Sequence, residues 1–150
     1  MRIEGSYSLP GTPETVYASL VDPVLLADCL PGCQQLVAAG EGVYNMKMKI
    51  ALAALSGDFV GRIAVEDPVP PTSYRLRVEG TGRIGFLNGL GELRLTPGDN
   101  NTTLISYHGD VNTGGTIAAV GQRLLDTTAR MMIRRFFDKL ESLLRTSLKA

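Results

Sequence analysis

Apolar and polar residues alternate along the middle of the chain, which is the spacing of β-strands with one buried face. The clearest run is 44–50, where Asn45, Lys47 and Lys49 share one side and the apolar residues between them share the other. The same alternation recurs elsewhere, with glycine, proline and asparagine turns between the runs. It predicts seven strands, at 3–9, 35–39, 44–50, 57–65, 74–83, 91–95 and 103–111.

Two short helices are predicted between the first two strands. Residues 12–14, Thr-Pro-Glu, supply an N-cap, a proline at the first helical position and an acidic first turn, and this helix runs to about Leu20. A second helix begins at the Asp-Pro pair 22–23 and ends at the Leu-Pro-Gly step 30–32.

The apolar spacing changes after two glycines at 114–115. From there the chain is predicted to form one unbroken amphipathic helix over 116–148, capped by Thr116 and about 45–50 Å long at 1.5 Å per residue. The apolar face is defined by steps of three or four residues, through Ala118, Gly121, Leu125, Ala129, Met132, Phe136, Leu140 and Leu143.

This order of elements predicts an α+β fold of the helix-grip type. A curved antiparallel seven-stranded sheet would wrap around the long C-terminal helix, with the two short helices between strands 1 and 2. The 150 residues form one domain, 1–150, which is large enough to bury a core without metals or disulfides. A long helix laid across such a sheet leaves a cleft, so binding of an apolar small molecule is the first function to consider.

Composition narrows the class of protein. Hydrophobic residues make up 44% of the chain and the net charge is zero, which disfavours a nucleic-acid binder. From Thr116 onward, however, the chain contains seven basic and three acidic residues, which gives this segment a net charge of +4. This segment is either a solvated helix face or a surface for anionic lipid headgroups or an acidic partner. No stretch approaches the roughly 18 apolar residues of a spanning helix, and no signal peptide is evident, so we expect a cytoplasmic protein.

Residues that could carry catalysis or bind a metal are few. Cys29, Cys33 and His108 fall short of the four ligands of a structural zinc site, and we interpret the cysteines as thiols packing a turn, although a disulfide between them stays open. Strand alternation directs His108 outward, and no serine has a nucleophile-elbow setting. We therefore expect no catalytic residues, no metal, no covalent cofactor and no enzymatic activity.

The inner faces of the sheet and helix supply the candidate ligand-binding residues. Methionines adapt to irregular apolar ligands and tyrosines can donate to a carbonyl oxygen, while glycines at 57, 61, 80, 82, 85, 89 and 91 leave room. Segment 80–91, with Ile84, Phe86 and Leu87 at its tip, is either a gate that contacts a membrane or a plain hairpin. The predicted ligand-binding residues are Tyr44, Met46, Met48, Phe59, Tyr74, Leu76, Phe86, Leu93, Tyr107, Val120, Leu124, Leu125, Met132 and Phe136.

An ordered set of short segments resembles one known family. It comprises Asp-Pro at 22–23, Leu26, Cys-Leu-Pro-Gly-Cys at 29–33, Phe-Val-Gly at 59–61, the glycine-rich segment 80–91, Thr-Leu-Ile-Ser-Tyr at 103–107, Gly-Gly at 114–115, Ala118, Gly121, Arg-Leu at 123–124 and Phe-Phe at 136–137. Together they resemble the carbon monoxide dehydrogenase G-subunit family of START-like (SRPBCC) helix-grip proteins, over nearly the whole chain.

The resemblance implies a function as well as a fold. Members of the family are associated with molybdenum-containing carbon monoxide dehydrogenases and related hydroxylases, and some relatives attach to a membrane through a C-terminal extension. It implies a bound apolar ligand, a menaquinone-like respiratory quinone, delivered to such an enzyme at the inner face of the membrane. Two other hypotheses stay open: an assembly or membrane-recruitment factor for that enzyme, and a cyclase or hydrolase of the same superfold.

Overall fold

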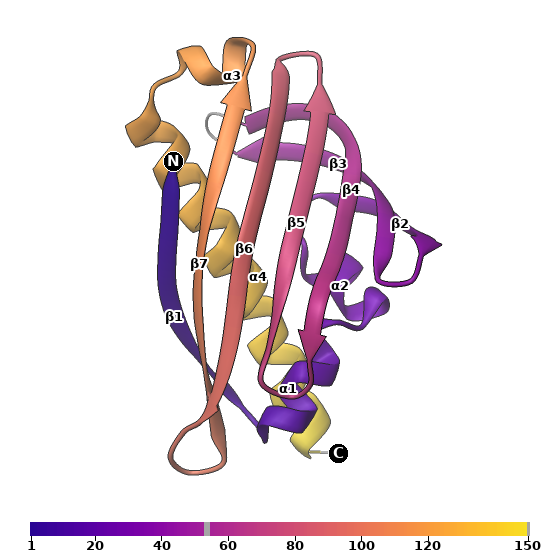
Figure 1. The fold of residues 1–150 in the computed structure, drawn as a ribbon, viewed down its shortest axis with the longest axis vertical. Coiled ribbons are helices and arrows are strands. Elements are labelled where there is room, and N and C mark those ends of the chain that lie inside the picture. The colour runs from indigo at the N-terminus through magenta and orange to yellow at the C-terminus, as the bar shows by residue number, and fades with distance from the viewer. Residues whose placement is uncertain (53–54, 150) are drawn as a thin grey trace.

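The main feature of the molecule is one curved antiparallel sheet (Figure 1). The computed structural model describes residues 1–52 and 55–149. Its seven strands follow the order β1-β7-β6-β5-β4-β3-β2, each pairing antiparallel with its neighbours. They are β1 (Arg2–Pro10), β2 (Cys33–Gly40), β3 (Val43–Leu52), β4 (Leu55–Val69), β5 (Ser73–Gly82), β6 (Gly85–Pro97) and β7 (Thr102–Gly114).

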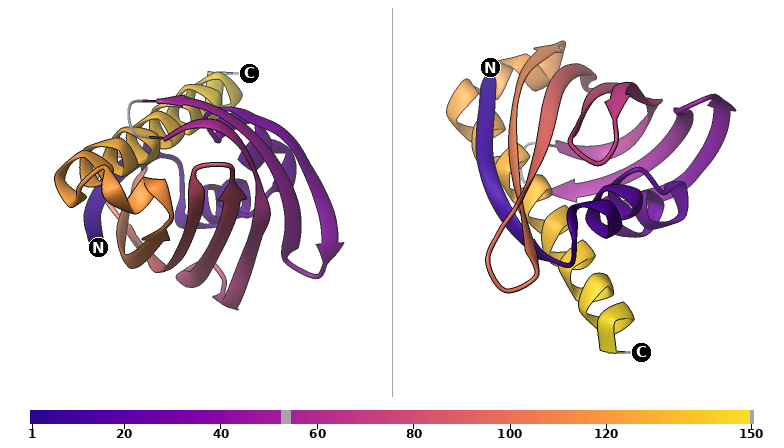
Figure 2. Two further views of the ribbon diagram at one scale, coloured as in Figure 1. Left: turned by 90° about the horizontal axis from the view of Figure 1, so that it is seen from above. Right: turned by 60° about the horizontal axis from the view of Figure 1, so that its bottom comes forward.

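The sheet curves around the C-terminal helix α4 (Gln122–Lys149), as the view from above in Figure 2 shows. Helix α4 contacts the edge strand β1 on one side and α2 on the other. Sheet and helix therefore enclose a space, and the predicted α+β helix-grip fold is confirmed.

The two short helices form where the sequence predicts them. In α1 (Pro13–Leu20) the Thr12 hydroxyl accepts a hydrogen bond from the Thr15 amide. In α2 (Pro23–Cys29) the Asp22 carboxylate accepts one from the Val24 amide at 2.8 Å. These side chains satisfy amides that have no partner within the helix.

The long C-terminal helix is interrupted, which corrects the prediction of an unbroken helix over 116–148. A short helix α3 (Thr116–Ala119) ends before α4 begins, and Gly121 between them has a φ of +103°. That backbone conformation is open to glycine and strained for other residues, so the chain changes direction there.

Segment 80–91 forms a hairpin between β5 and β6. Strands β5 and β6 pair as far as Gly82 opposite Gly85, which leaves only Arg83 and Ile84 at the turn. Strand β6 is accordingly longer than the predicted 91–95, because its glycines keep their place in the ladder through backbone hydrogen bonds.

The buried apolar residues form two clusters. The larger one joins α1, β1, β5, β6, β7 and the second half of α4, and includes Leu9, Val16 and Leu140. The smaller one joins Met48 and Phe59 of the sheet to Ile117 of α3 and Leu125 of α4.

Candidate ligand-binding cavity

A cavity of about 350 Å³ lies between the concave face of the sheet and α4, and it is open on one side. This volume is within the range of small-molecule sites, roughly 300–1,000 Å³. Its wall is almost entirely apolar and borders both core clusters. An apolar ligand can therefore be buried here without displacing the core.

The cavity wall on the sheet is organised in rows that run across β5, β6 and β7. One row contains Tyr74, Leu93 and Tyr107, which are paired in register. In the next row Leu76 is followed by Gly91 and Gly109, and in the row after that Val78 is followed by Gly89. At these glycines the wall consists of backbone. We call the four glycines of this wall the glycine patch: Gly80, Gly89, Gly91 and Gly109.

Most of the predicted ligand-binding residues come together around this cavity. Alternation along the strands directs the sheet residues inward, and helical periodicity directs the two α4 residues toward them. The predicted residues that line the cavity are Met46, Met48, Phe59, Tyr74, Leu76, Leu93, Tyr107, Met132 and Phe136.

Five predicted residues lie elsewhere. Val120 and Leu124 are 39% and 42% exposed. Val120 lies before the break at Gly121, outside α4, and Leu124 lies in α4 beside Leu125, which takes the buried position. Leu125 is buried, but in the smaller core cluster below α3 and not in the cavity wall. Tyr44 is half-buried on β3 outside the wall, and Phe86 is 43% exposed, facing outward with its ring against Gly114.

Tyr74 is the most enclosed polar side chain of the cavity wall, with 3% of its surface exposed. Its ring makes an edge-to-face contact with Tyr17, at a centroid distance of 5.6 Å. Burial raises the pKa of Tyr74 above its ordinary value, because the phenolate would be poorly solvated there. Tyr74 therefore stays protonated at physiological pH and can donate a hydrogen bond.

Tyr107 is the second hydroxyl of the wall and is half-buried. Its ring stacks on Phe137 of α4 at 5.9 Å and lies over Gly5 of β1, where a larger side chain would collide with it. The absent side chain of Gly5 thus lets Tyr107 lie flat along the edge of the cavity.

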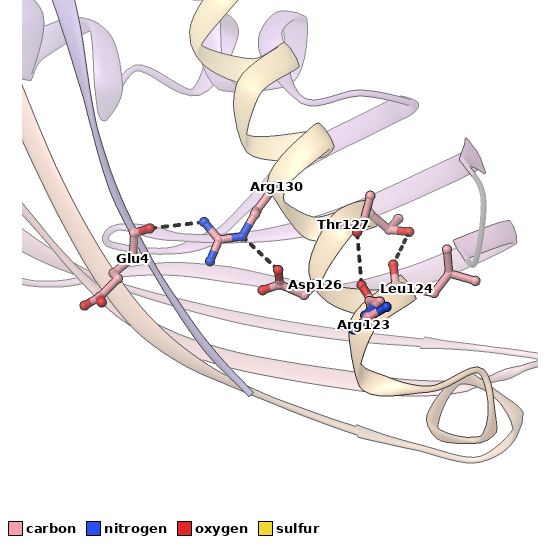
Figure 3. Close-up of polar contacts among 7 residues, drawn as sticks. Glu4, Arg123, Leu124, Asp126, Thr127 and Arg130 are labelled. Atoms are coloured by element: carbon pink, nitrogen blue, oxygen red, sulfur yellow. Dashed lines mark hydrogen bonds and ion pairs between the residues drawn. The ribbon is translucent and has the colours of Figure 1, made fainter.

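The first turns of α4 are fastened beside the cavity by a set of polar contacts (Figure 3). The Arg130 guanidinium bonds the Asp126 carboxylate at 2.8 Å and donates to the backbone oxygen of Glu4 on β1 at 3.4 Å. Figure 3 shows Arg130 reaching from the helix across to β1. The contact joins the helix to the sheet edge next to Ala129, which lines the cavity.

The two cysteines are free thiols in the structure, Cys29 buried and Cys33 half-buried. Burial raises the pKa of Cys29 to about 11 and also raises the pKa of Cys33. His108 is exposed on the outer face of β7. Within residues 1–52 and 55–149, no group of three or more histidine, cysteine or acidic side chains is placed to hold a metal ion.

Comparison with known protein families gives a match over residues 5–145, to the model of the carbon monoxide dehydrogenase G subunit, CoxG. The chain belongs to the CoxG family. This confirms the resemblance noted in the sequence.

Solved structures similar to this CoxG-family protein support the fold. A conserved protein from Geobacillus kaustophilus is 37% identical, with a TM-score of 0.95 over 98% of this chain and 97% of that one. A START superfamily protein from Mycobacterium smegmatis is 12% identical, with a TM-score of 0.75 over 97% of each chain. The Zhui aromatase/cyclase from Streptomyces sp. R1128 is 16% identical, with a TM-score of 0.74 over 100% of this chain and 96% of that one. No curated protein sequence matches.

The CoxG family and the START-like fold both point to the binding of a hydrophobic ligand. The cavity between the sheet and α4 is the place in this CoxG-family protein that suits it. Among the helices of the described residues, none is long and apolar enough to cross a membrane.

Sequence reasoning missed several residues that line the cavity of this CoxG-family protein. Ile50, Ile63 and Val78 follow the same strand alternation as their predicted neighbours and could have been found from it. Leu26 and Leu30 of the α2 region could not, because their position depends on how α2 packs against α4.

Proposed function

We propose that this CoxG-family protein binds a menaquinone-like respiratory quinone in its cavity and delivers it to a carbon monoxide dehydrogenase-type molybdenum hydroxylase. The observation that supports the proposal best is the open, almost wholly apolar cavity of about 350 Å³ with two tyrosines in its wall. This volume is near the lower end for small-molecule sites, so it suits the ring and the start of the isoprenoid tail. The rest of the tail would leave through the opening.

Apolar burial alone does not explain transfer out of a membrane. Removing apolar surface from water is worth about 25 cal/mol per Å², but a quinone in lipid is already out of water. Preference for the protein must come from shape and from hydrogen bonds to the ring oxygens. In the described wall, Tyr74 and Tyr107 carry the hydroxyl groups, and we propose that they donate to the ring oxygens.

We further propose that the protein carries its ligand without chemical change. Apart from these tyrosines, the side chains that face the cavity are apolar. A few polar residues also line it, but their side chains face outward and only their backbone borders the cavity. Acid–base catalysis of cyclisation or hydrolysis needs a titratable group near neutrality that reaches the substrate. Incubation with the quinone should return it unaltered, and a changed product in chromatography would favour the cyclase or hydrolase alternative.

Filling the cavity tests the binding proposal. A Cβ on Gly80 would meet nothing within 4 Å, and Gly80 lines the cavity with an ordinary φ, so Gly80→Leu should fold and occupy ligand space. We expect it to weaken binding of a short-chain menaquinone, measured by quenching of tyrosine fluorescence, by about tenfold or more. Thr81→Leu, which adds the same side chain on the exposed outer face of β5, is the control and should bind normally. Equal binding by Gly80→Leu and the wild type would count against the cavity as the binding site.

Delivery is tested separately from binding. Arg134 and Arg135 are exposed on α4, and neither makes an ion pair among the described residues. Reversing both charges should leave the affinity for menaquinone unchanged but slow reduction of the bound quinone by the purified dehydrogenase. If the wild type binds no quinone and still promotes assembly or membrane attachment of that enzyme, the assembly-factor alternative is the better one.

A further inference from the structure

The inner wall of the cavity exposes main-chain atoms at the glycine patch. Leu90, Glu92, His108 and Asp110 alternate with its glycines, and they also line a polar hollow of about 420 Å³ on the outer face of the sheet. They nevertheless line the inner cavity as well. Since their side chains face outward, their backbone is what borders the inner cavity.

The four positions of the glycine patch are occupied by glycine for different structural reasons. A Cβ on Gly91 would lie 3.1 Å from the His108 oxygen, and one on Gly109 would lie 2.9 Å from the Leu90 oxygen. Close approach of the two strands therefore accounts for both of these glycines.

Packing does not account for Gly80 and Gly89. A Cβ on Gly80 would meet nothing within 4 Å, and one on Gly89 would come no closer than 3.7 Å, to Val111. Neither residue has a positive φ. A glycine inside a strand costs about 0.5–1 kcal/mol relative to alanine, so what these two provide is open space above the backbone.

An independent observation points to a ligand in that space. Tyr74 lines the same cavity and is 3% exposed, yet its hydroxyl makes no hydrogen bond among the described residues. Within those residues no fully buried polar side-chain atom is left without a partner. The Tyr74 hydroxyl is therefore not fully enclosed by protein, and a ligand in the cavity that Tyr74 lines would give it a partner.

We infer that the glycine patch seats the flat face of a fused planar ring, with one ring oxygen accepting a hydrogen bond from the Tyr74 hydroxyl. This inference rests on the proposed function and specifies the orientation of its ligand. Gly91 of β6 pairs with Gly109 of β7, Gly89 lies two residues along β6, and Gly80 of β5 lies diagonally beyond it. The bare backbone at Gly89, Gly91 and Gly109 thus extends roughly 5 Å across the strands and roughly 7 Å along them, which suits a bicyclic ring. Rings that carry substituents on their faces are held away from such a surface, so the patch selects flat ligands.

The first experiment adds one methyl group to the surface of the glycine patch. Gly89→Ala should lower the affinity for a short-chain menaquinone by about tenfold, and a saturated fatty acid, whose chain can bend around the methyl group, should lose much less. The unliganded variant should unfold at the same or a higher temperature than the wild type, because the native φ suits alanine. Gly80→Ala is the second variant, and Asn88→Ala, on the outer face of β6, is the control.

The second experiment removes the hydroxyl. Tyr74→Phe should lower the affinity for the menaquinone by about fivefold and leave unchanged the affinity for a carbonyl-free naphthalene analogue. A purely structural role of Tyr74 would change the affinity for both probes alike.

The outcomes separate the inference from the proposed function. If the wild type binds the menaquinone but Gly89→Ala and Gly80→Ala bind it equally well, the ring does not lie on the patch and the inference is overturned alone. If the wild type binds neither the menaquinone nor the fatty acid, both are overturned.

Discussion

The hydroxyl of Tyr7 on β1 donates a hydrogen bond to the carboxylate of Asp138 on α4, and the Tyr7 ring stacks on Phe137 with the centroids 5.1 Å apart. Because β1 is an edge strand, this pair fastens the second half of α4 to the rim of the sheet. The hydrogen bond to Asp138, with burial as a smaller cause, raises the pKa of Tyr7 to about 12.

Tyr7→Phe should keep the ring stack and lose the hydrogen bond. We expect the free energy of unfolding near neutral pH to fall by about 1 kcal/mol, measured by urea titration. A raised pKa in the folded state means that this stabilisation is complete below the ordinary value of 10.0 and is lost as the pH rises through about 12. The difference between the two proteins should therefore shrink above pH 10. Ser6→Ala, on the outer face of β1, is the control, and identical stability of Tyr7→Phe and the wild type at neutral pH would contradict the prediction.

The break between α3 and α4 should depend on Gly121. Because a Cβ there would meet nothing within 4 Å, the cost of Gly121→Ala comes only from its φ of +103°. We expect a loss of about 1–2 kcal/mol in the free energy of unfolding. Gln122→Ala, at the first residue of α4, should be nearly neutral. An unchanged unfolding midpoint for Gly121→Ala would show that the backbone can adopt another conformation there.

Two residues of α4 should differ in their effect on ligand affinity. Met132 lines the cavity, whereas Leu124 is 42% exposed outside it. Met132→Ala should lower the affinity for a short-chain menaquinone by about tenfold, because it removes contacts in the cavity wall. Leu124→Ala should leave the affinity close to that of the wild type. If a fluorescence titration showed the opposite pattern, Leu124 and not Met132 would contact the ligand.

The buried thiol of Cys29 should resist alkylation in the native protein. Its pKa of about 11 keeps it protonated near neutral pH, and the thiolate is the reactive form. Iodoacetamide labelling followed by mass spectrometry should modify Cys29 slowly in the folded protein and rapidly in urea. Equal rates in the two states would mean that the α2 region opens readily.

The fold follows from the sequence because its signals are local and agree with one another. Alternation over 44–50 predicts β3, and the N-caps at Thr12 and Asp22 predict both short helices. The limits of β6 were missed because glycines weaken local strand preference, while here the pairing to β5 and β7 holds them in the ladder.

The site was harder to predict because it depends on one backbone dihedral and on tertiary packing. Gly121 fits the apolar spacing of a helix, so the sequence gives no sign of the break that leaves Val120 outside α4. Leu124 and Leu125 are adjacent, about 100° apart around the helix, and of the two only Leu125 is buried. Phe86 was predicted at the tip of segment 80–91, but β6 already begins at Gly85, and strand alternation directs Leu87 toward the cavity and Phe86 away from it.

The glycine patch has a consequence for how this binding site can diverge. Where side chains form the wall of a cavity, substitution can enlarge the cavity, reduce it or change its polarity. Where main-chain atoms form the wall, substitution can only reduce the volume of the cavity. At Gly80 and Gly89 every replacement adds bulk to the hollow. A relative with glycine at both positions keeps the largest cavity volume. Substitution at these positions can change ligand specificity only by reducing that volume.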